Sequence, residues 1–166
     1  DGFEILGLPD SELEFLGQPT TFASWLEMNF DAAQLADPLV TGAGADPDAD
    51  GVTNFGEYGR GSIPTIADGS GTVAARLVEV DGEEYVAIEF TRSLTATDLD
   101  TRVQISNDLK TWMENGGGET LTEVLGTRRA SDGLTETVVE RTLQPVAGRL
   151  QDTNTFLRAV FELVAP

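Results

Sequence analysis

The pattern of hydrophobic and polar positions divides the chain into two parts that differ in period. Within residues 19–37, apolar side chains recur at helical spacing, which is typical of a helix with one buried face. After about residue 70 the period changes to two, which indicates strands. The sequence therefore predicts a helical N-terminal part followed by a β-rich part. The predicted helical face carries Phe22, Trp25, Leu26 and Phe30.

Capping residues mark the ends of the predicted helices. Thr20 or Thr21 can cap the first turn, and Asp31 can cap a second short helix over "AAQLA" that Pro38 ends. Trp25 is expected to anchor the core, because large aromatic side chains are usually buried. The stretch from Leu39 toward the acidic loop, "LVTGAGA", is not expected to be helical.

Residues 72–92 carry the clearest hairpin signal. Asp81-Gly82 is a preferred two-residue turn. Counting outward from it pairs Val80 with Glu83 and Leu77 with Val86, and this register gathers apolar residues on one face. The opposite face is also more apolar than a solvated face needs, so we expect something to cover part of it. The predicted core face consists of Val73, Ala75, Leu77, Val86, Ile88 and Phe90, and the opposite face contains Val78, Val80, Tyr85 and Ala87.

Four later segments alternate in the same way and are separated by loops rich in Gly and Asp. Several short strands joined by turns indicate an antiparallel β-sandwich, Ig-like or jelly-roll-like, so the predicted fold class is mainly β. The predicted organisation is an N-terminal extension (1–18), a helical segment with an acidic loop (19–66) and the sandwich (67–166), packed as one domain. The four predicted strands are residues 102–106, 120–125, 135–143 and 155–164.

The N-terminal extension also shows a strand period. Leu13 and Phe15 alternate with Glu12 and Glu14. Residues 1–16 can either cover their own domain or add a strand to the sheet of a neighbouring molecule, and the sequence leaves both open.

Composition narrows the classes of partner. Ten basic residues face 29 acidic ones, a formal net charge of −19. This balance argues against nucleic acid and anionic membranes as partners and favours cations. No apolar run approaches the ~18 residues of a membrane span, so no membrane insertion is expected. The absence of Cys and His excludes thiol nucleophiles, imidazole bases and Ser-His-Asp triads.

The most specific motif is "DPDADGVTNFGE", residues 46–57. It fits the EF-hand-type calcium loop D-x-[DN]-x-[DN]-G-x5-E without a gap. Calcium takes about 6–8 oxygen ligands, and a divalent cation turns the repulsion among these carboxylates into attraction. Gly51 permits the bend that the loop needs. The predicted ligands are Asp46, Asp48, Asp50, the backbone carbonyl of Val52, Asn54 and Glu57.

The flanks of this motif differ from those of a calcium sensor. There is one loop rather than a pair, and the segment after Glu57 soon meets Gly59, Gly61 and Pro64. A sensor opens a groove between two full helices, which this pattern does not provide. The interpretation is a structural Ca²⁺ that ties the helical segment to the sandwich; an acidic surface turn without an ion is the alternative.

The stretch "DPDADGVTNFGEYGRG" resembles the "DPDGDGLSNLLEYALG" signature of many secreted proteins of aquatic bacteria. In that family a Trp-containing helix precedes the signature, and a β-rich region follows it, here matched by "TRSLTATDLDTRVQISNDLKTW" and a late "FLRAVF". The resemblance covers roughly residues 20–163 and implies an extracellular calcium-binding β-domain. Gly56 and Gly59 depart from the family's "LLEYAL" and weaken the exit helix.

These observations predict a secreted or cell-surface protein whose signal peptide was removed before Asp1. The predicted role is non-catalytic and structural, a surface or matrix component that self-associates, as a filament or polymer subunit, through its N-terminal strand. The alternative is a calcium-dependent carbohydrate-binding or adhesion module for extracellular polysaccharide. In that alternative Trp112, Tyr58 and Tyr85 can stack on sugar rings.

Overall fold

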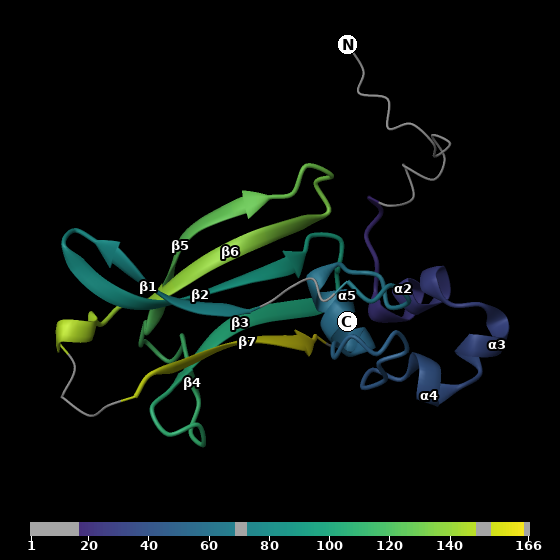
Figure 1. Cartoon of the computed structure of the whole chain (residues 1–166), viewed down its shortest axis with the longest axis horizontal. Helices are drawn as coiled ribbons and strands as arrows, with labels where there is room; N and C mark the ends of the chain where they lie inside the picture. Colours follow the sequence, from purple (N-terminus) through teal and green to yellow (C-terminus); the bar gives the residue numbers. More distant parts are fainter. Residues whose placement is uncertain (1–16, 69–72, 149–153, 165–166) are drawn as a thin grey trace, which may run out of the picture.

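The computed structural model describes residues 17–68, 73–148 and 154–164 (Figure 1). Strand accounts for 41% of the structure and helix for 18%, which confirms the mainly β class. No helix in these ranges is long and apolar enough to cross a membrane. The α-helices of the described residues precede all the strands, as the change of period predicted; they are α2 (Phe22–Asn29), α3 (Ala32–Leu35), α4 (Pro38–Thr41) and α5 (Asn54–Arg60). A short 3-10 helix, η1 (Val146–Gly148), follows the strand β6 (Thr135–Thr142).

The first sheet has four antiparallel strands in the order β1-β2-β6-β5. The predicted hairpin forms β1 (Ala74–Val80) and β2 (Glu83–Ser93), and Leu77 lies opposite Val86 as the turn required. Asp81 and Gly82 both have positive φ, 54° and 83°, which a two-residue turn of this hand demands. The sheet is completed by β5 (Thr122–Arg129) and β6 (Thr135–Thr142).

The second sheet has three antiparallel strands in the order β4-β3-β7. They are β3 (Leu99–Ser106), the two-residue β4 (Met113–Glu114) and β7 (Phe156–Leu163). All four later strands expected from the sequence are present with boundaries shifted by a few residues. The short β4 was not predicted, because two residues carry no period.

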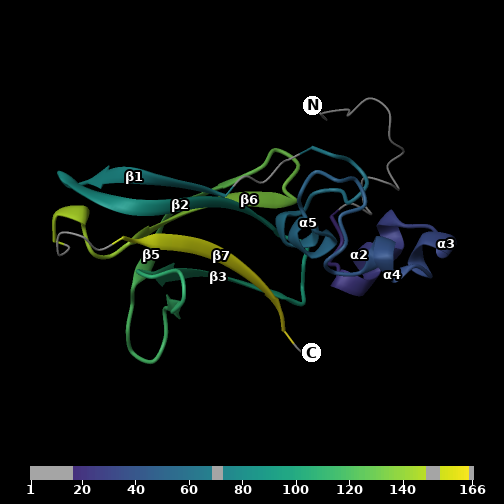
Figure 2. The same ribbon diagram turned by 60° about the horizontal axis from the view of Figure 1, so that its bottom comes forward.

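The core lies between the two sheets, which form two layers in Figure 2. The four-stranded sheet contributes β2 and β6 to it, and the three-stranded sheet contributes β3 and β7. Apolar burial between the sheets is therefore what holds the layers together. The core consists of Ile88, Phe90, Val103 and Val138, with Leu157 and Ala159 packed against it.

The predicted core face of the hairpin is only partly correct. Ile88 and Phe90 are buried, but Leu77 is 55% exposed, and Ala75 and Val73 are exposed as well. The reason is that β1 lies at the margin of its sheet, whereas the core forms over β2 and β6. The opposite face is covered in part, since Arg141 lies 3.8 Å from the centre of the Tyr85 ring and Ala87 is fully buried.

The helical part lies at one end of the two sheets (Figures 1 and 2). Thr21 caps α2 and Asp31 caps α3, as predicted. Pro38 does more than end a helix: it opens α4, with Asp37 accepting a hydrogen bond from the Leu39 N–H. The expectation of no helix before the acidic loop was therefore wrong for this turn, because proline is well suited to a first helical position.

Aromatic side chains join α2 to α5. The Tyr58 ring lies 5.3 Å from that of Phe22 and 5.6 Å from that of Trp25, between ring centres. Phe55 meets Phe22 edge to face at 5.5 Å. Trp25 is buried as predicted. This cluster fixes α5 against the rest of the helical part, and α5 carries the last residue of the acidic motif.

Candidate metal centre

Three aspartates of the loop converge on one point. Oxygen atoms of Asp46, Asp48 and Asp50, one from each carboxylate, all lie within 4.8 Å of one another. Burial first, and then the charges of Asp50 and Asp46, raise the pKa of Asp48 above its usual range. The sequence pattern thus produces a close group of carboxylates that could bind a metal ion.

Backbone hydrogen bonds hold the loop in this shape. The Asp50 N–H donates to Asp48 Oδ1 at 3.2 Å, and the Gly51 N–H donates to Asp46 Oδ2 at 3.0 Å. Gly51 has a φ of 92°, which is costly for any residue with a side chain, so the predicted need for glycine at the bend is confirmed. These bonds use one oxygen of Asp46 and one of Asp48. Asp46 Oδ1 and Asp48 Oδ2 remain buried without a hydrogen-bond partner among the described residues.

Glu57 is buried within range of the charges of these aspartates, but its carboxylate does not belong to the group whose oxygens lie within 4.8 Å of one another. Its side chain is 1% exposed, and neither of its carboxylate oxygens has a hydrogen-bond partner in the described part of the chain. Burial first, and then the charges of Asp48 and Asp50, raise the pKa of Glu57 to about 7. A buried carboxylate with no cation and no donor is strongly unfavourable, so this position calls for a positive partner.

Asn54 presents a further oxygen. Its residue is 0% exposed, and its Nδ2 donates to the carbonyls of Val40 and Gly42 at 2.8 and 3.0 Å. Two acceptors on that side fix the orientation of the amide, because only the nitrogen can donate to them. Asn54 Oδ1 is consequently left buried and without a partner among the described residues.

The donor set suits a hard divalent cation. Buried oxygens lacking partners come from four of the predicted ligands, namely Asp46, Asp48, Asn54 and Glu57. Oxygen-only donors with several carboxylates are what Ca²⁺ and Mg²⁺ take, whereas softer metals prefer nitrogen and sulfur. For Val52 the structure gives only its N–H, which donates to Asp50 Oδ1 at 2.8 Å, so the role of its carbonyl stays a prediction.

One acidic residue near this centre was missed by the motif. Asp68 follows α5 by eight residues, and its charge contributes to raising the pKa of Glu57. No spacing rule pointed to it, since it comes from a loop outside the pattern. It adds to the negative potential that the centre presents to a cation.

Helix α5 connects the centre to both sheets. The Tyr58 hydroxyl donates to the Asp98 carboxylate, which in turn accepts from the Phe22 N–H at 3.1 Å. The same hydroxyl lies 2.9 Å from the carbonyl oxygen of Thr20. At Gly59, the Phe161 ring of β7 approaches so closely that an added Cβ would lie 2.8 Å from it. Consecutive residues of α5 thus place Glu57 within range of the acidic loop's charges, Tyr58 at the segment before β3 and Gly59 at β7.

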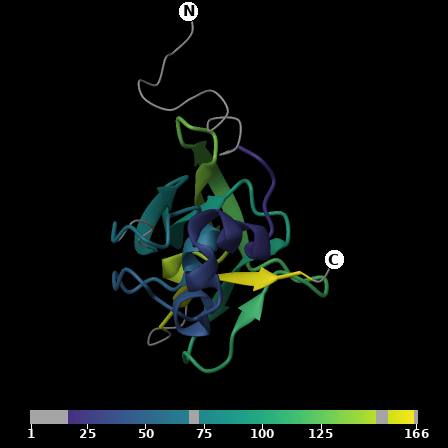
Figure 3. The ribbon, with the colours of Figure 1, turned by 90° about the vertical axis from the view of Figure 1, so that its right-hand side faces the viewer.

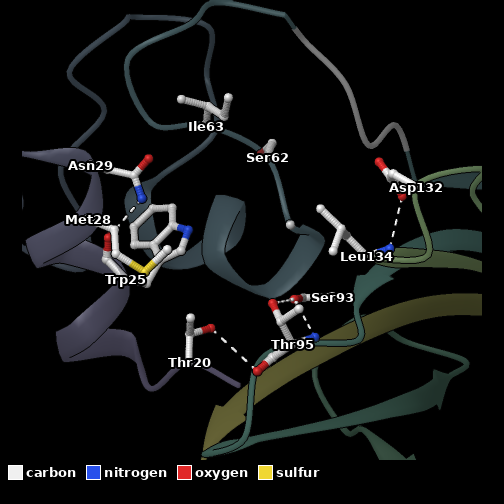
Figure 4. A pocket seen from close by; sticks show the side chains of 11 residues that line it. Thr20, Trp25, Met28, Asn29, Ser62, Ile63, Ser93, Thr95, Asp132 and Leu134 are labelled. Carbon is white, nitrogen blue, oxygen red and sulfur yellow. Dashed lines mark hydrogen bonds between the residues drawn. The ribbon is translucent and has the colours of Figure 1, made fainter. Parts of the chain in front are cut away.

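A cavity of about 380 Å³ lies on another side of this junction, between α2, the segment after α5 and the β5–β6 turn (Figure 4). The hydroxyls of Ser93 and Thr95 in its wall bond each other at 3.1 Å. Its single acidic residue, Asp132, already accepts from the Leu134 N–H at 2.9 Å. The described lining therefore offers no pair of carboxylates for acid–base chemistry. It comprises Thr20, Trp25, Met28, Asn29, Gly61, Ser62, Ile63, Ser93, Thr95, Asp132 and Leu134.

The three aromatic residues suggested for sugar stacking have different surroundings. Tyr58 is 1% exposed within the aromatic cluster, so its suggested role is wrong. The ring of Tyr85 is covered by Arg141. Trp112 is half-buried beside β4, with the Arg158 guanidinium 4.1 Å from its ring centre. The structure does not bring these residues together into one platform.

Comparisons with family models, with curated proteins and with solved structures find no match to this chain. The function must therefore be argued from the geometry itself. The acidic loop and α5 are the features with the most unusual physical chemistry, because four of their residues have buried oxygens without a hydrogen-bond partner among the described residues.

Proposed function

We propose that this chain is a secreted, non-catalytic structural protein whose fold is completed by one Ca²⁺ bound at residues 46–57. The observation that carries the proposal is the buried carboxylate of Glu57, which has no hydrogen-bond partner among the described residues and is subject to the charges of Asp48, Asp50 and Asp46. In this proposal the ligands are Asp46, Asp48, Asp50, the Val52 carbonyl, Asn54 and Glu57. The loop is then EF-hand-like and serves a β-sandwich.

Calcium is preferred to magnesium for two reasons. The motif supplies four carboxylates, an amide and a carbonyl, which match the ~6–8 oxygens that Ca²⁺ takes. Mg²⁺ demands octahedral geometry and dehydrates reluctantly, so it seldom uses a cage made entirely of protein ligands. A ligand as deeply buried as Glu57 has little room for retained metal waters.

The ion acts as a structural tie in this proposal. Helix α5 is seven residues long and α4 is one turn, so the described helices form no groove between long helices that an ion could open. In this proposal the ion neutralises Glu57 in the first turn of α5. The next two residues of the helix, Tyr58 and Gly59, contact Asp98, Thr20 and Phe161. Binding should therefore order the junction between the helical part and the sheets.

Calorimetry and melting test this function together. Titration of Ca²⁺ into the chelator-treated chain should show one binding site, and Ca²⁺ at 100 times its dissociation constant should add about 2.7 kcal/mol to the free energy of unfolding. Glu57→Gln keeps the size of the side chain and should abolish both signals. A melting temperature indifferent to EDTA, together with no heat of binding, would refute the proposal.

A structural role outside the cell is supported by composition and by the N-terminal segment. The net charge of −19 repels copies of the chain from one another unless cations screen it, and residues 1–16 carry strand-like alternation. We propose that the chain self-associates, as a filament or polymer subunit, by adding this segment to a neighbour. Electron microscopy with and without chelator should show ordered assemblies only when Ca²⁺ is present.

A calcium-dependent carbohydrate-binding or adhesion module is the second candidate. It is favoured by Trp112, whose ring lies against the Arg158 guanidinium, and this guanidinium donates to the Gln104 side chain on the three-stranded sheet. Sugar recognition commonly combines an aromatic ring with planar polar groups. Binding on a glycan array that Trp112→Ala abolishes would support this candidate, and the absence of binding to any glycan of the array would count against it.

A further inference from the structure

Strand β5 presents the most open edge of the four-stranded sheet. It is the last strand in the order β1-β2-β6-β5, and no described strand pairs with its outer side. Seven of its eight residues are exposed. Val124 is 54% and Leu125 41% exposed, so apolar side chains line an edge whose backbone groups can accept another strand.

Charge distinguishes β5 from the other long edge strands of the described chain. Both β1 and β7 carry one basic and one acidic residue each, whereas β5 carries Arg128 and Arg129 against Glu123. Glu123 is ion-paired with Arg141 from β6. Arg128 and Arg129 form no ion pair with any described residue. On a chain of net charge −19, β5 is therefore an edge strand with a net positive charge.

The chain outside the described residues has the complementary character. Residues 1–16 contain five acidic residues and no basic one, and their apolar residues alternate with the acids near Leu13 and Phe15. Fully extended, sixteen residues span ~53 Å, about twice the ~26 Å length of an eight-residue strand. This segment is therefore long enough to pair along all of β5 and still bridge two molecules.

Residues 1–16 could pair with β5 of their own molecule or with β5 of a second copy. The position of Gly17, where this segment joins the described chain, favours the second copy. A methyl group at Gly17 would lie 4.0 Å from Leu134, beside the β5–β6 turn where β5 ends (Figures 1 and 3). Pairing with its own β5 would therefore run parallel to that strand. All strand pairs of both sheets are antiparallel, and parallel pairs are slightly less stable per residue. A segment from a second copy can run antiparallel.

We propose that β5 is the receiving edge for residues 1–16 of a second copy of this chain. The inference rests on the proposed self-association and specifies where it occurs. Main-chain hydrogen bonds to β5 provide the binding, and Arg128 and Arg129 select an acidic strand. The remaining edge strands, which lack a net positive charge, are left unused.

A charge swap in the full-length chain tests this inference in calcium-containing buffer. Sedimentation velocity measures the concentration at which assembly begins. R128E/R129E should raise that concentration at least tenfold, and adding E12R/E14R to the same chain should restore it to within about threefold of the original. R76E/K110E makes the same change of net charge on other surfaces and should change it less than twofold. Circular dichroism confirms that each variant is folded.

Each contrary outcome has a distinct meaning. If the chain assembles but R128E/R129E has no effect, or if R76E/K110E weakens assembly equally, self-association stands and the β5 edge is overturned. If the chain stays monomeric and the swap changes only its melting temperature, the segment pairs within its own molecule and the second copy is overturned. Amide exchange should protect residues 122–129 in the assembled chain, and protection on β1 or β7 instead would also overturn the inference.

Discussion

Buried glutamates in the two parts of the molecule differ in whether they have hydrogen-bond partners. Glu136 lies inside the four-stranded sheet, 7% exposed, and accepts from Arg92 Nε at 2.9 Å. Glu140 on the same strand accepts from the Thr122 hydroxyl. Glu57, at the junction of the helical part, is more deeply buried and has no donor or cation among the described residues.

This difference indicates what each part needs in order to fold. The sheets supply partners for their buried charges from their own side chains, so their stability should be independent of any ion. The helical part leaves its charge balance incomplete and should depend on a cation from solution. An apolar core and an ion-dependent junction then coexist in one chain and can be perturbed separately.

The strongest test of this separation is a cavity in the core of the sheets. Ile88→Ala removes a fully buried side chain and should cost about 2–5 kcal/mol of unfolding free energy. The cost should be the same with Ca²⁺ and with EDTA, as measured by urea unfolding. Val124→Ala, at an exposed position, is the control and should cost far less. A core cost that disappears with chelator would show that the sheets also rely on the ion.

A matched pair of glutamine substitutions sharpens the comparison at the charges themselves. Glu57→Gln should eliminate the roughly 2.7 kcal/mol that saturating Ca²⁺ adds, because it removes a charged ligand. Glu136→Gln weakens the bond to Arg92 but should leave the calcium increment intact. Thermal melts of both variants with and without Ca²⁺ provide the measurement. Equal loss of the increment in both variants would contradict the assignment of the site.

The contact between the two parts can be perturbed at one atom. Gly59→Ala places a Cβ 2.8 Å from the Phe161 ring, and such overpacking should cost about 1–3 kcal/mol, offset by up to ~1 kcal/mol from better helix propensity. Gly44→Ala, where nothing lies within 4 Å, should be nearly neutral. Both variants should be compared in calcium-binding titrations. If Gly59→Ala lowers stability without weakening Ca²⁺ binding, α5 does not couple the centre to the sheets.

Features that depend on neighbours along the chain could be predicted from the sequence, whereas features that depend on how the sheets assemble could not. The register of the β1–β2 hairpin followed from Asp81-Gly82, and the caps Thr21 and Asp31 followed from residue type, because both depend on neighbours in the chain. The exposure of Leu77 could not be predicted, since it depends on how far the second sheet extends. The alternation of apolar and polar residues indicates which face of a strand is buried, but it does not indicate where the strand lies in the sheet.

The same distinction applies to the candidate site. The motif contains every described residue with a buried carboxylate or amide oxygen that lacks a hydrogen-bond partner, because those residues are close in sequence. Two features were beyond it: the charge of Asp68, from a separate loop, and the link from Tyr58 to Asp98, forty residues away. Tyr58 in particular resembled a surface aromatic until its burial was known. Long-range partners determine whether an aromatic residue is a platform or a core residue.

A further expected effect is a pH dependence that should distinguish the two parts. The pKa of Glu57 is about 7 in the folded chain without metal, above its ordinary value of 4.5. The folded state therefore binds a proton that the unfolded state releases between these values, so metal-free stability should fall as pH rises from about 5 to 7. Calcium needs the same carboxylate ionised, so its apparent affinity should weaken by up to about tenfold per pH unit below 7. The stabilisation by Ca²⁺ should accordingly grow toward pH 7 and level off above it, and Glu57→Gln should remove both trends.

Urea unfolding at pH 5, 6, 7 and 8, with and without Ca²⁺, measures this pH dependence. Metal-free stability that rises over the same interval would mean that Glu57 is already balanced within the chain, as Glu136 is, and the contrast between the two parts would be lost.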